Sequence, residues 1–266
     1  MHSWVETILL GVIEGITEFL PISSTGHLIL AQFFLGEPRS EFFNIGIQAG
    51  AMLAVILIYW RRLLDLAVHW RQPEQFAYWT KCTGAFFVTA GLGLGVKKLG
   101  FTLPEDPWPV TWAVLVGAFV IFGVERWARG RSLQDSISWP VALGIGAAQV
   151  LAGVFPGASR SGTTIMAAMA MGTSRLAATE FSFLLGIPTM FAATAYAGYE
   201  FYKEHGGFPK DEMDEFWIGF VVSTVVAFIA VKWLLVFIRS HTFVPFAWYR
   251  LGLGLFLVGY LLWVGA

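Results

Sequence analysis

Six apolar stretches, each close to the length needed to cross a bilayer, set the strongest limit on how this chain can fold. Hydrophobic residues make up 56% of its 266 positions and charged residues 13%, against roughly a quarter charged in soluble domains. Lipid does not tolerate unpaired backbone groups, so such stretches are expected to be helices. The predicted spans are residues 42–60, 79–98, 109–127, 180–200, 216–238 and 245–264. The sequence therefore predicts an all-α polytopic membrane protein, and its net charge of −1 gives no indication of a nucleic-acid partner.

Four further apolar segments are too short or too polar to span, and they form two pairs, 4–19 with 24–35 and 139–154 with 161–172. Proline and glycine interrupt each pair at its centre, in "EFLPISSTGH" and in "VFPGASRSG". Broken backbone at membrane depth must be surrounded by protein or by a water-filled cavity. Each pair is therefore predicted to be a re-entrant hairpin, which enters and leaves the membrane on the same side.

The two hairpins resemble copies of one another. Glu14 and Gln149 each lie seven residues before the proline of their break. Ser24 and Ser159 each lie three residues after it, and "EFFNIGI" downstream of the first hairpin is echoed by "EFSFLLGI" downstream of the second. This ordered similarity predicts an internal repeat.

Each repeat is expected to hold one hairpin and three spans, about residues 1–131 and about residues 132–266 of a single membrane domain. Because three is odd, the second copy must enter from the opposite side, which makes an inverted-topology repeat of the kind known from transporters. One set of loops carries seven Arg or Lys residues and is predicted to be cytoplasmic; the other set carries four. Both termini and the mouth of the first hairpin are then expected to lie outside.

Two glutamates lie inside the first hairpin, where an ionisable group is costly and by default marks a function. Glu14 and Glu18 are one helical turn apart, so their carboxylates repel each other unless a cation or a shared proton intervenes. The pair could face water near a helix end. Alternatively, a divalent cation could bridge the pair to an anionic substrate. These acidic residues are also unlike a signal peptide, so the segment is expected to remain in the mature protein.

The break of the first hairpin is rich in hydroxyl groups, with Ser23, Ser24 and Thr25 before Gly26 and His27. Ser23 or Ser24 can cap the following helix, and free N–H groups at a helix start also bind anions, so capping and phosphate binding are compatible. His27 lies three residues after Ser24, on the same helical face, where it could deprotonate the hydroxyl. A structural histidine bonded to a carbonyl is the alternative. Next to two carboxylates and several hydroxyls, we favour catalysis.

The break of the second hairpin supplies a positive charge. In "PGASRSGTT", Arg160 lies in a Gly/Ser-rich turn that opens a helix, an arrangement suited to holding a phosphate with a guanidinium and backbone N–H groups. An arginine that extends to the membrane surface is the alternative. The expected phosphate ligands beside it are Ser159, Ser161, Thr163 and Thr164.

The segments "EGxTEFLPxSSTGH" and "PGxSRSG", in this order, resemble the undecaprenyl-diphosphate phosphatase family, which is also known for bacitracin resistance. The resemblance covers the whole chain, including "TEFSFLLGIP" after the second segment and "FVPFAWYR" near the end. It implies hydrolysis of undecaprenyl diphosphate to undecaprenyl phosphate and inorganic phosphate, which recycles the lipid carrier for peptidoglycan and other wall polymers. It places functional positions at Glu14, Glu18, Ser24, His27, Ser159 and Arg160.

The resemblance further implies a divalent cation, Mg²⁺ or Ca²⁺, with Glu14 and Glu18 as its ligands. The expected location is the bacterial cytoplasmic (inner) membrane, with the active site open to the periplasmic side and membrane lipids as partners; a homodimer is left open. The three-residue spacing of Ser24 and His27 favours a scheme in which Ser24 attacks phosphorus while His27 takes its proton. A rival scheme makes His27 the nucleophile, and direct attack by water is also left open. Ser23 and Thr25 are expected to bind the phosphates.

Two other functions fit parts of the pattern. Inverted repeats with broken helices usually indicate transport, so the protein could be a carrier that returns undecaprenyl phosphate across the bilayer. A non-catalytic scaffold would leave the polar residues of both breaks unexplained. His27 beside Ser24 and the glutamate pair favours the enzyme, because a binding site has less need of a general base.

Overall fold

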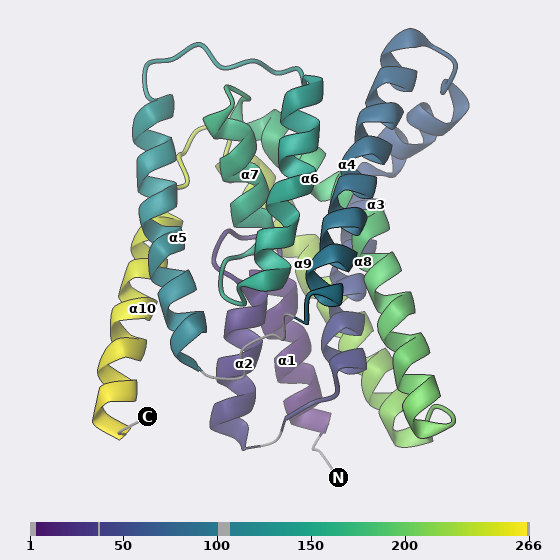
Figure 1. The fold of residues 1–266 in the computed structure, drawn as a ribbon, viewed down its shortest axis with the longest axis vertical. Helices are drawn as coiled ribbons and strands as arrows, with labels where there is room; N and C mark the ends of the chain where they lie inside the picture. Colours follow the sequence, from purple (N-terminus) through teal and green to yellow (C-terminus); the bar gives the residue numbers. More distant parts are fainter. Residues whose placement is uncertain (1–3, 37, 101–106, 265–266) are drawn as a thin grey trace.

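The computed structural model describes residues 4–36, 38–100 and 107–264, and this part of the chain forms ten α-helices and no strand (Figure 1). The all-helical class is thus confirmed for the described residues. In chain order the helices are α1 (Trp4–Thr17), α2 (Ser24–Leu35), α3 (Glu41–Val68), α4 (Pro73–Lys98), α5 (Pro107–Ala128), α6 (Trp139–Val154), α7 (Arg160–Ala170), α8 (Arg175–His205), α9 (Lys210–Phe237) and α10 (Val244–Val264).

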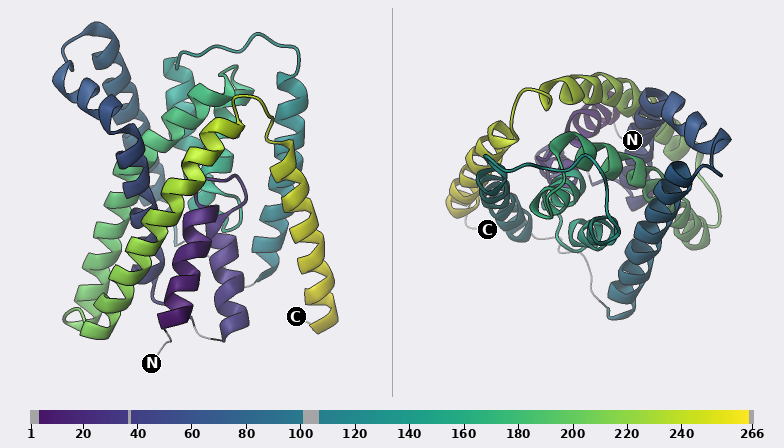
Figure 2. Two further views of the ribbon diagram at one scale, coloured as in Figure 1. Left: turned by 180° about the vertical axis from the view of Figure 1, so that it is seen from behind. Right: turned by 90° about the horizontal axis from the view of Figure 1, so that it is seen from above.

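Five of the described helices, α3, α5, α8, α9 and α10, are long and apolar enough to cross a membrane. Helix α4 coincides with another predicted span and has 26 residues, but its glycines, threonines and lysines make it less apolar. Figure 2 shows α4 leaning away from the bundle in the view from above. Length and composition therefore confirm five of the six predicted spans, and the sixth stays a prediction.

Large apolar side chains cover the outside of the spanning helices. Trp112 on α5, Ile229 on α9 and Trp263 on α10 are among those exposed. A surface of this kind would associate in water, whereas in lipid it is the normal outer face of a helix bundle. The protein is a multi-pass membrane protein.

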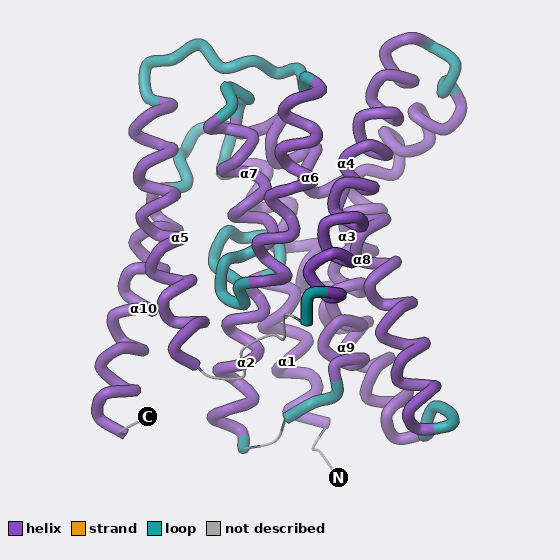
Figure 3. Tube along the Cα trace, viewed as in Figure 1, coloured by secondary structure: helices purple, strands orange, loops and turns teal. Residues whose placement is uncertain are grey.

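Two helix pairs form the predicted hairpins. Helices α1 and α2 occupy one half of the bundle and α6 and α7 the other half, and the two non-helical turns meet at mid-height (Figures 1 and 3). The described ends of α1 and α10 lie at one end of the bundle, and the α3–α4 and α5–α6 connections lie at the opposite end. This arrangement agrees with two oppositely oriented hairpins.

Close packing holds the first hairpin in place. Helices α1 and α3 both pack against α9. A Cβ atom at Gly15 of α1 would lie 2.7 Å from Cβ of Val226, and one at Gly50 of α3 would lie 2.5 Å from the carbonyl oxygen of Phe220. Small residues of this kind let helices approach closely in membranes. The packing fixes the depth of α1, and with it the depth of the two glutamates.

Candidate active site

The two hairpins turn in the same way. Ser23 (φ 77°) and Ser159 (φ 73°) are the only non-glycine residues with positive φ in the described part of the chain. Each caps the helix that follows: Ser23 Oγ accepts a hydrogen bond from Gly26 N and Ser159 Oγ accepts one from Gly162 N, both at 3.1 Å. A left-handed serine is strained, and such strain gathers at functional sites. The structural equivalent of Ser159 is therefore Ser23, one residue earlier than the expected Ser24.

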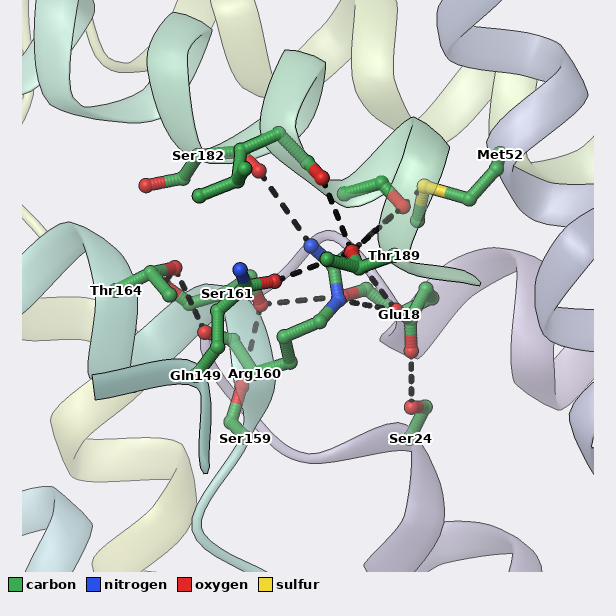
Figure 4. A network of polar contacts seen from close by, with 12 residues as sticks. Glu18, Ser24, Met52, Gln149, Ser159, Arg160, Ser161, Thr164, Ser182 and Thr189 are labelled. Atoms are coloured by element: carbon green, nitrogen blue, oxygen red, sulfur yellow. Dashed lines mark hydrogen bonds and ion pairs between the residues drawn. The ribbon is translucent and has the colours of Figure 1, made fainter. Parts of the chain in front are cut away.

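This shared turn makes Ser24 and Arg160 equivalent, each the first residue of its helix, and both side chains reach Glu18 (Figure 4). Ser24 Oγ donates to Glu18 Oε2 at 2.5 Å. Arg160 Nε and Nη2 donate to Glu18 Oε1 at 3.1 and 2.9 Å. The carboxylate at the end of the first hairpin thus joins a hydroxyl from its own hairpin to a guanidinium from the other. The breaks of the two hairpins therefore lie together in the fold.

The Glu18–Arg160 pair is shielded from solvent, with 4% and 9% of the two side chains exposed. A buried ion pair loses hydration on both sides, and breaking it by removal of one partner is strongly destabilising. A phosphate that entered the site could take over the guanidinium, because Arg also binds phosphate oxygens in its fork. Glu18 would then be free to act on the Ser24 proton.

Glu14 is fully buried one turn before Glu18. Neither of its carboxylate oxygens has a hydrogen-bond partner of normal geometry among the described residues, although Glu18 lies close enough to repel it. Two carboxylates therefore share one arginine, and the second carboxylate needs a proton or a cation. Within the described residues no group of three or more His, Cys, Asp or Glu could hold a metal ion. Any cation here would depend on these two glutamates and on oxygen ligands from elsewhere.

His27 does not contact the Ser24 hydroxyl as expected. Its Nδ1 lies 2.6 Å from the carbonyl oxygen of Ser23, and its Nε2 lies 2.7 Å from the hydroxyl of Tyr249 on α10. A carbonyl can only accept, so Nδ1 carries the proton; in the neutral ring Nε2 then accepts from Tyr249. The hydrogen-bond partner of the Ser24 hydroxyl is Glu18 instead, which corrects the predicted serine–histidine pair.

The other expected phosphate ligands hold the turns together. The Ser161 hydroxyl lies 3.1 Å from the carbonyl oxygens of Glu18 and Leu20, which joins the second hairpin to the turn of the first. Thr163 donates to a carbonyl of its own helix, 3.0 Å away at Ser159, and Thr164 likewise to a carbonyl 2.7 Å away. These hydroxyls donate their protons to carbonyl oxygens of the protein. An ionised phosphate accepts hydrogen bonds and does not donate them, so in this arrangement the hydroxyls have no proton to offer a phosphate. Thr25 is half-buried in the first turn of α2.

An apolar cleft of about 480 Å³ opens beside the first hairpin, towards α10. His27, Tyr249 and Thr17 are its polar lining residues, and the others are apolar side chains such as Ile13 and Phe246. A cleft of this composition suits an isoprenoid chain, with the polar residues at the headgroup end. His27 and Tyr249 thus lie at the polar edge of this apolar cleft.

Sequence reasoning missed Tyr249, Arg250 and the Thr89–Gln149–Thr189 network. Gln149 Nε2 donates to Thr89 Oγ1 at 3.1 Å. Thr189 Oγ1 lies 3.3 Å from Gln149 Oε1, to which it donates (Figure 4). Arg250 carried a usable signal, since an arginine surrounded by apolar residues in a predicted span marks a function by default. Tyr249 carried no such signal.

The comparisons with known proteins agree over nearly the full length. The family model described as "Bacitracin resistance protein BacA" matches residues 7–256. An undecaprenyl-diphosphatase of Rhizobium etli (strain CIAT 652) is 56% identical over 257 residues, 96% of each chain. Relatives of the same name are 54% identical in Methylacidiphilum infernorum (isolate V4), over 97% of this chain and 96% of the relative, and 49% identical in Xanthomonas oryzae pv. oryzae (strain PXO99A), over 100% and 99%. The chain belongs to the bacitracin resistance protein BacA family.

Proposed function

We propose that this protein hydrolyses undecaprenyl diphosphate to undecaprenyl phosphate and inorganic phosphate, where the two hairpin turns meet. The 2.5 Å hydrogen bond from the Ser24 hydroxyl to Glu18, with Arg160 on the same carboxylate, is the observation that carries this proposal. A hydroxyl bonded to a buried carboxylate is an activated nucleophile, and the guanidinium is placed to hold a phosphate. The names of the relatives point to the same reaction.

In the first step, Ser24 Oγ attacks the terminal phosphorus and Glu18 accepts its proton. The bond from that phosphorus to the bridging oxygen breaks, Glu18 passes the proton to this oxygen, and undecaprenyl phosphate leaves. Arg160 and the N-termini of α2 and α7 stabilise the negative charge of the transferring group. In the second step, water attacks the phosphoserine, Glu18 transfers the proton of this water to Ser24 Oγ, and inorganic phosphate is released.

The rival scheme uses His27 as the nucleophile. Its Nε2 is the ring nitrogen without a proton, so it could attack phosphorus once the Tyr249 hydroxyl moves away. Ser24 would then only bind phosphate. The two schemes predict different phosphoproteins, which the first experiment of the Discussion separates.

A divalent cation fits this site. Glu14 offers two buried carboxylate oxygens without a partner of normal geometry among the described residues, and carboxylates are the ligands that Mg²⁺ and Ca²⁺ prefer. Mg²⁺ in particular is often held by one or two carboxylates together with substrate phosphates. Glu14 and, after release from Arg160, Glu18 would hold it. When bound, such an ion offsets negative charge on the phosphate oxygens.

The protein is proposed to lie in the bacterial cytoplasmic (inner) membrane, with the mouth of the first hairpin facing the outer side. The arginines in and next to the α3–α4 and α5–α6 connections, at the end of the bundle opposite this mouth, support that orientation. Membrane lipids surround it, and a homodimer stays an untested prediction. Labelling single cysteines from outside the cell near the end of α10 tests the orientation; cytoplasmic placement would overturn it.

Hydrolysis is tested by phosphate release from a prenyl diphosphate, measured with purified protein in detergent. The wild-type protein should release inorganic phosphate, and the Glu18→Gln variant, which cannot accept the Ser24 proton, should not. The oppositely oriented hairpins are also the arrangement that carriers use, so transport of undecaprenyl phosphate is the alternative. Binding of the lipid without any phosphate release would favour that carrier and refute the phosphatase.

A further inference from the structure

Arg250 lies in the spanning helix α10, yet it has the largest fully buried side chain in the described part of the chain, with 1% exposed. An arginine inside a membrane helix is costly and needs partners. The proposed reaction gives it no role, because Arg160 is the guanidinium at Glu18. The position of Arg250 therefore calls for a separate explanation.

All five N–H groups of this guanidinium have acceptors, and none of the acceptors is a carboxylate. Nε donates to a backbone carbonyl oxygen of α5 at 3.0 Å. Nη2 donates to another carbonyl oxygen of α5 at 2.8 Å and to one in the turn between α6 and α7 at 2.9 Å. Nη1 donates to a carbonyl oxygen in the turn between α1 and α2 and to one in the turn between α6 and α7, both at 3.2 Å. The acceptors are the backbone carbonyl oxygens of Val114, Ala113, Gly157, Pro21 and Ala158.

We propose that Arg250 is a positioning residue that joins the turns of the two re-entrant hairpins, and so sets how Ser24 and Arg160 converge on Glu18. Pro21 lies three residues before Ser24, and Ala158 directly precedes the cap of α7. A planar guanidinium offers its donors in a fixed fork, so it holds two backbones at one distance and orientation. The ammonium of lysine has three donors and cannot reproduce this arrangement. The inference rests on the proposed function.

Gly117 provides an independent way to disturb the same contact. A Cβ atom at Gly117 of α5 would lie 2.0 Å from Arg250 Nη2, which forces the guanidinium to move. Gly123, six residues further along α5, has nothing within 4 Å of its Cβ position. The Gly123→Ala variant is therefore a matched control for Gly117→Ala.

The kinetic test uses phosphate release by Arg250→Lys and Gly117→Ala in detergent, expressed per folded molecule. A small misplacement of reacting groups can cost roughly a hundredfold in rate, so kcat should fall by about that factor while KM changes far less. Gly123→Ala should match the wild type. If folded protein becomes scarcer but its kcat and KM are unchanged, Arg250 is only a structural residue and the proposal is wrong.

A double-mutant cycle sharpens the test. Once the Arg250 side chain is removed, a methyl group at Gly117 has no guanidinium to displace, so Gly117→Ala should have little further effect on kcat in the Arg250→Ala protein. An equal loss in both backgrounds would contradict the proposed contact. If Arg250→Ala does not fold, Arg250→Lys replaces it in the cycle.

A distance measurement tests the position of the hairpins without using activity. Spin labels at the exposed residues Phe34 of α2 and Met171 at the end of α7, in a Cys82→Ser background, report the spacing of the two hairpins. Arg250→Lys should broaden the distance distribution, and Gly123→Ala should not. An unchanged distribution would overturn the proposal even if activity falls. If the wild type releases no phosphate, the proposed function fails, and this measurement still decides the role of Arg250.

Discussion

The first hairpin, α1 with α2, and the second, α6 with α7, reverse direction through serines of the same left-handed conformation but place different side chains after them. Ser23 is followed by Ser24, and Ser159 is followed by Arg160. Both of these next residues bond the same carboxylate, that of Glu18. One backbone design, used twice from opposite sides, thus brings a hydroxyl and a guanidinium to a single point.

The hairpins also differ in the hydrogen bonding of the polar side chain that precedes each turn. In the first hairpin Glu14 is buried without a partner of normal geometry among the described residues. In the second, Gln149 is bonded by Thr89 and Thr189. A satisfied neutral network stabilises a fold, whereas an unsatisfied buried carboxylate is retained at a cost. The unsatisfied carboxylate therefore belongs to the first hairpin, and the bonded neutral network to the second.

The largest expected effect comes from removing the hydroxyl of the first hairpin. Ser24→Ala should abolish turnover, because no nucleophile remains. If Ser24 only bound phosphate, its loss would cost about 1.5 to 3 kcal/mol, roughly ten- to a hundredfold in rate. Phosphate release and rapid acid quench measure both outcomes, since phosphoserine survives acid and phosphohistidine does not. An acid-labile phosphoprotein formed by the Ser24→Ala enzyme would move the nucleophile to His27.

The role of the second hairpin is tested by replacing the guanidinium of Arg160. Arg160→Ala should lose nearly all activity, and Arg160→Lys should lose much of it although the charge remains, because lysine cannot form the planar fork. Arg62→Lys is the matched control, since the Arg62 side chain is 38% exposed on α3. The measurement is kcat/KM for phosphate release. Equal losses from Arg62→Lys and Arg160→Lys would mean that the loss is a general effect of replacing arginine by lysine and not a loss of phosphate recognition at Arg160.

Much of this asymmetry could be predicted from the sequence. Proline and glycine inside apolar segments indicate broken helices, and charged residues at such breaks are too costly to be accidental. Glu18 and Arg160 follow from that reasoning. The equivalence of Ser23 with Ser159 does not, because a left-handed serine is imposed by tertiary contacts and local preferences disfavour it.

Contacts distant in sequence were also beyond prediction. Tyr249 lies 222 residues after His27, and its hydroxyl is 2.7 Å from Nε2, the ring nitrogen that is left without a proton because Nδ1 donates to the Ser23 carbonyl. The sequence spacing placed His27 and Ser24 on one helical face, but a shared face does not determine the rotamer of either side chain. Glu18, at the end of the preceding helix, is the group that reaches the serine.

The glutamate pair is expected to give the next largest effect. If Glu14 and Glu18 hold a divalent ion, chelator should abolish phosphate release, and Glu14→Gln should raise the Mg²⁺ or Ca²⁺ concentration needed for half-maximal rate. Glu41→Gln, at the exposed start of α3, should leave that concentration unchanged. The measurement is a cation titration of the initial rate. Full activity in chelator would show that the reaction needs no metal ion, and that a proton shared with Glu18 offsets the charge of Glu14 instead.

The smallest effect concerns the two caps, where the hairpins should behave alike. Ser23→Ala and Ser159→Ala keep the left-handed conformation but lose the bond to the glycine N–H, so each should lower the stability of the protein by about 0.5 to 2 kcal/mol. Ser23→Gly and Ser159→Gly lose the same bond but remove the steric strain of positive φ, so each should cost far less or raise the melting temperature.

Thermal unfolding of the four variants in detergent, followed by tryptophan fluorescence, gives the comparison directly. If the turns are equivalent, each alanine variant should melt below its glycine counterpart, and by the same interval in both hairpins. A glycine that stabilised one turn and destabilised the other would show that the two serines are left-handed for different reasons. If the destabilised turn were that of Ser23, beside the proposed nucleophile Ser24, its strain would be the one that serves the reaction, and the structural equivalence of the hairpins would not extend to their energetics.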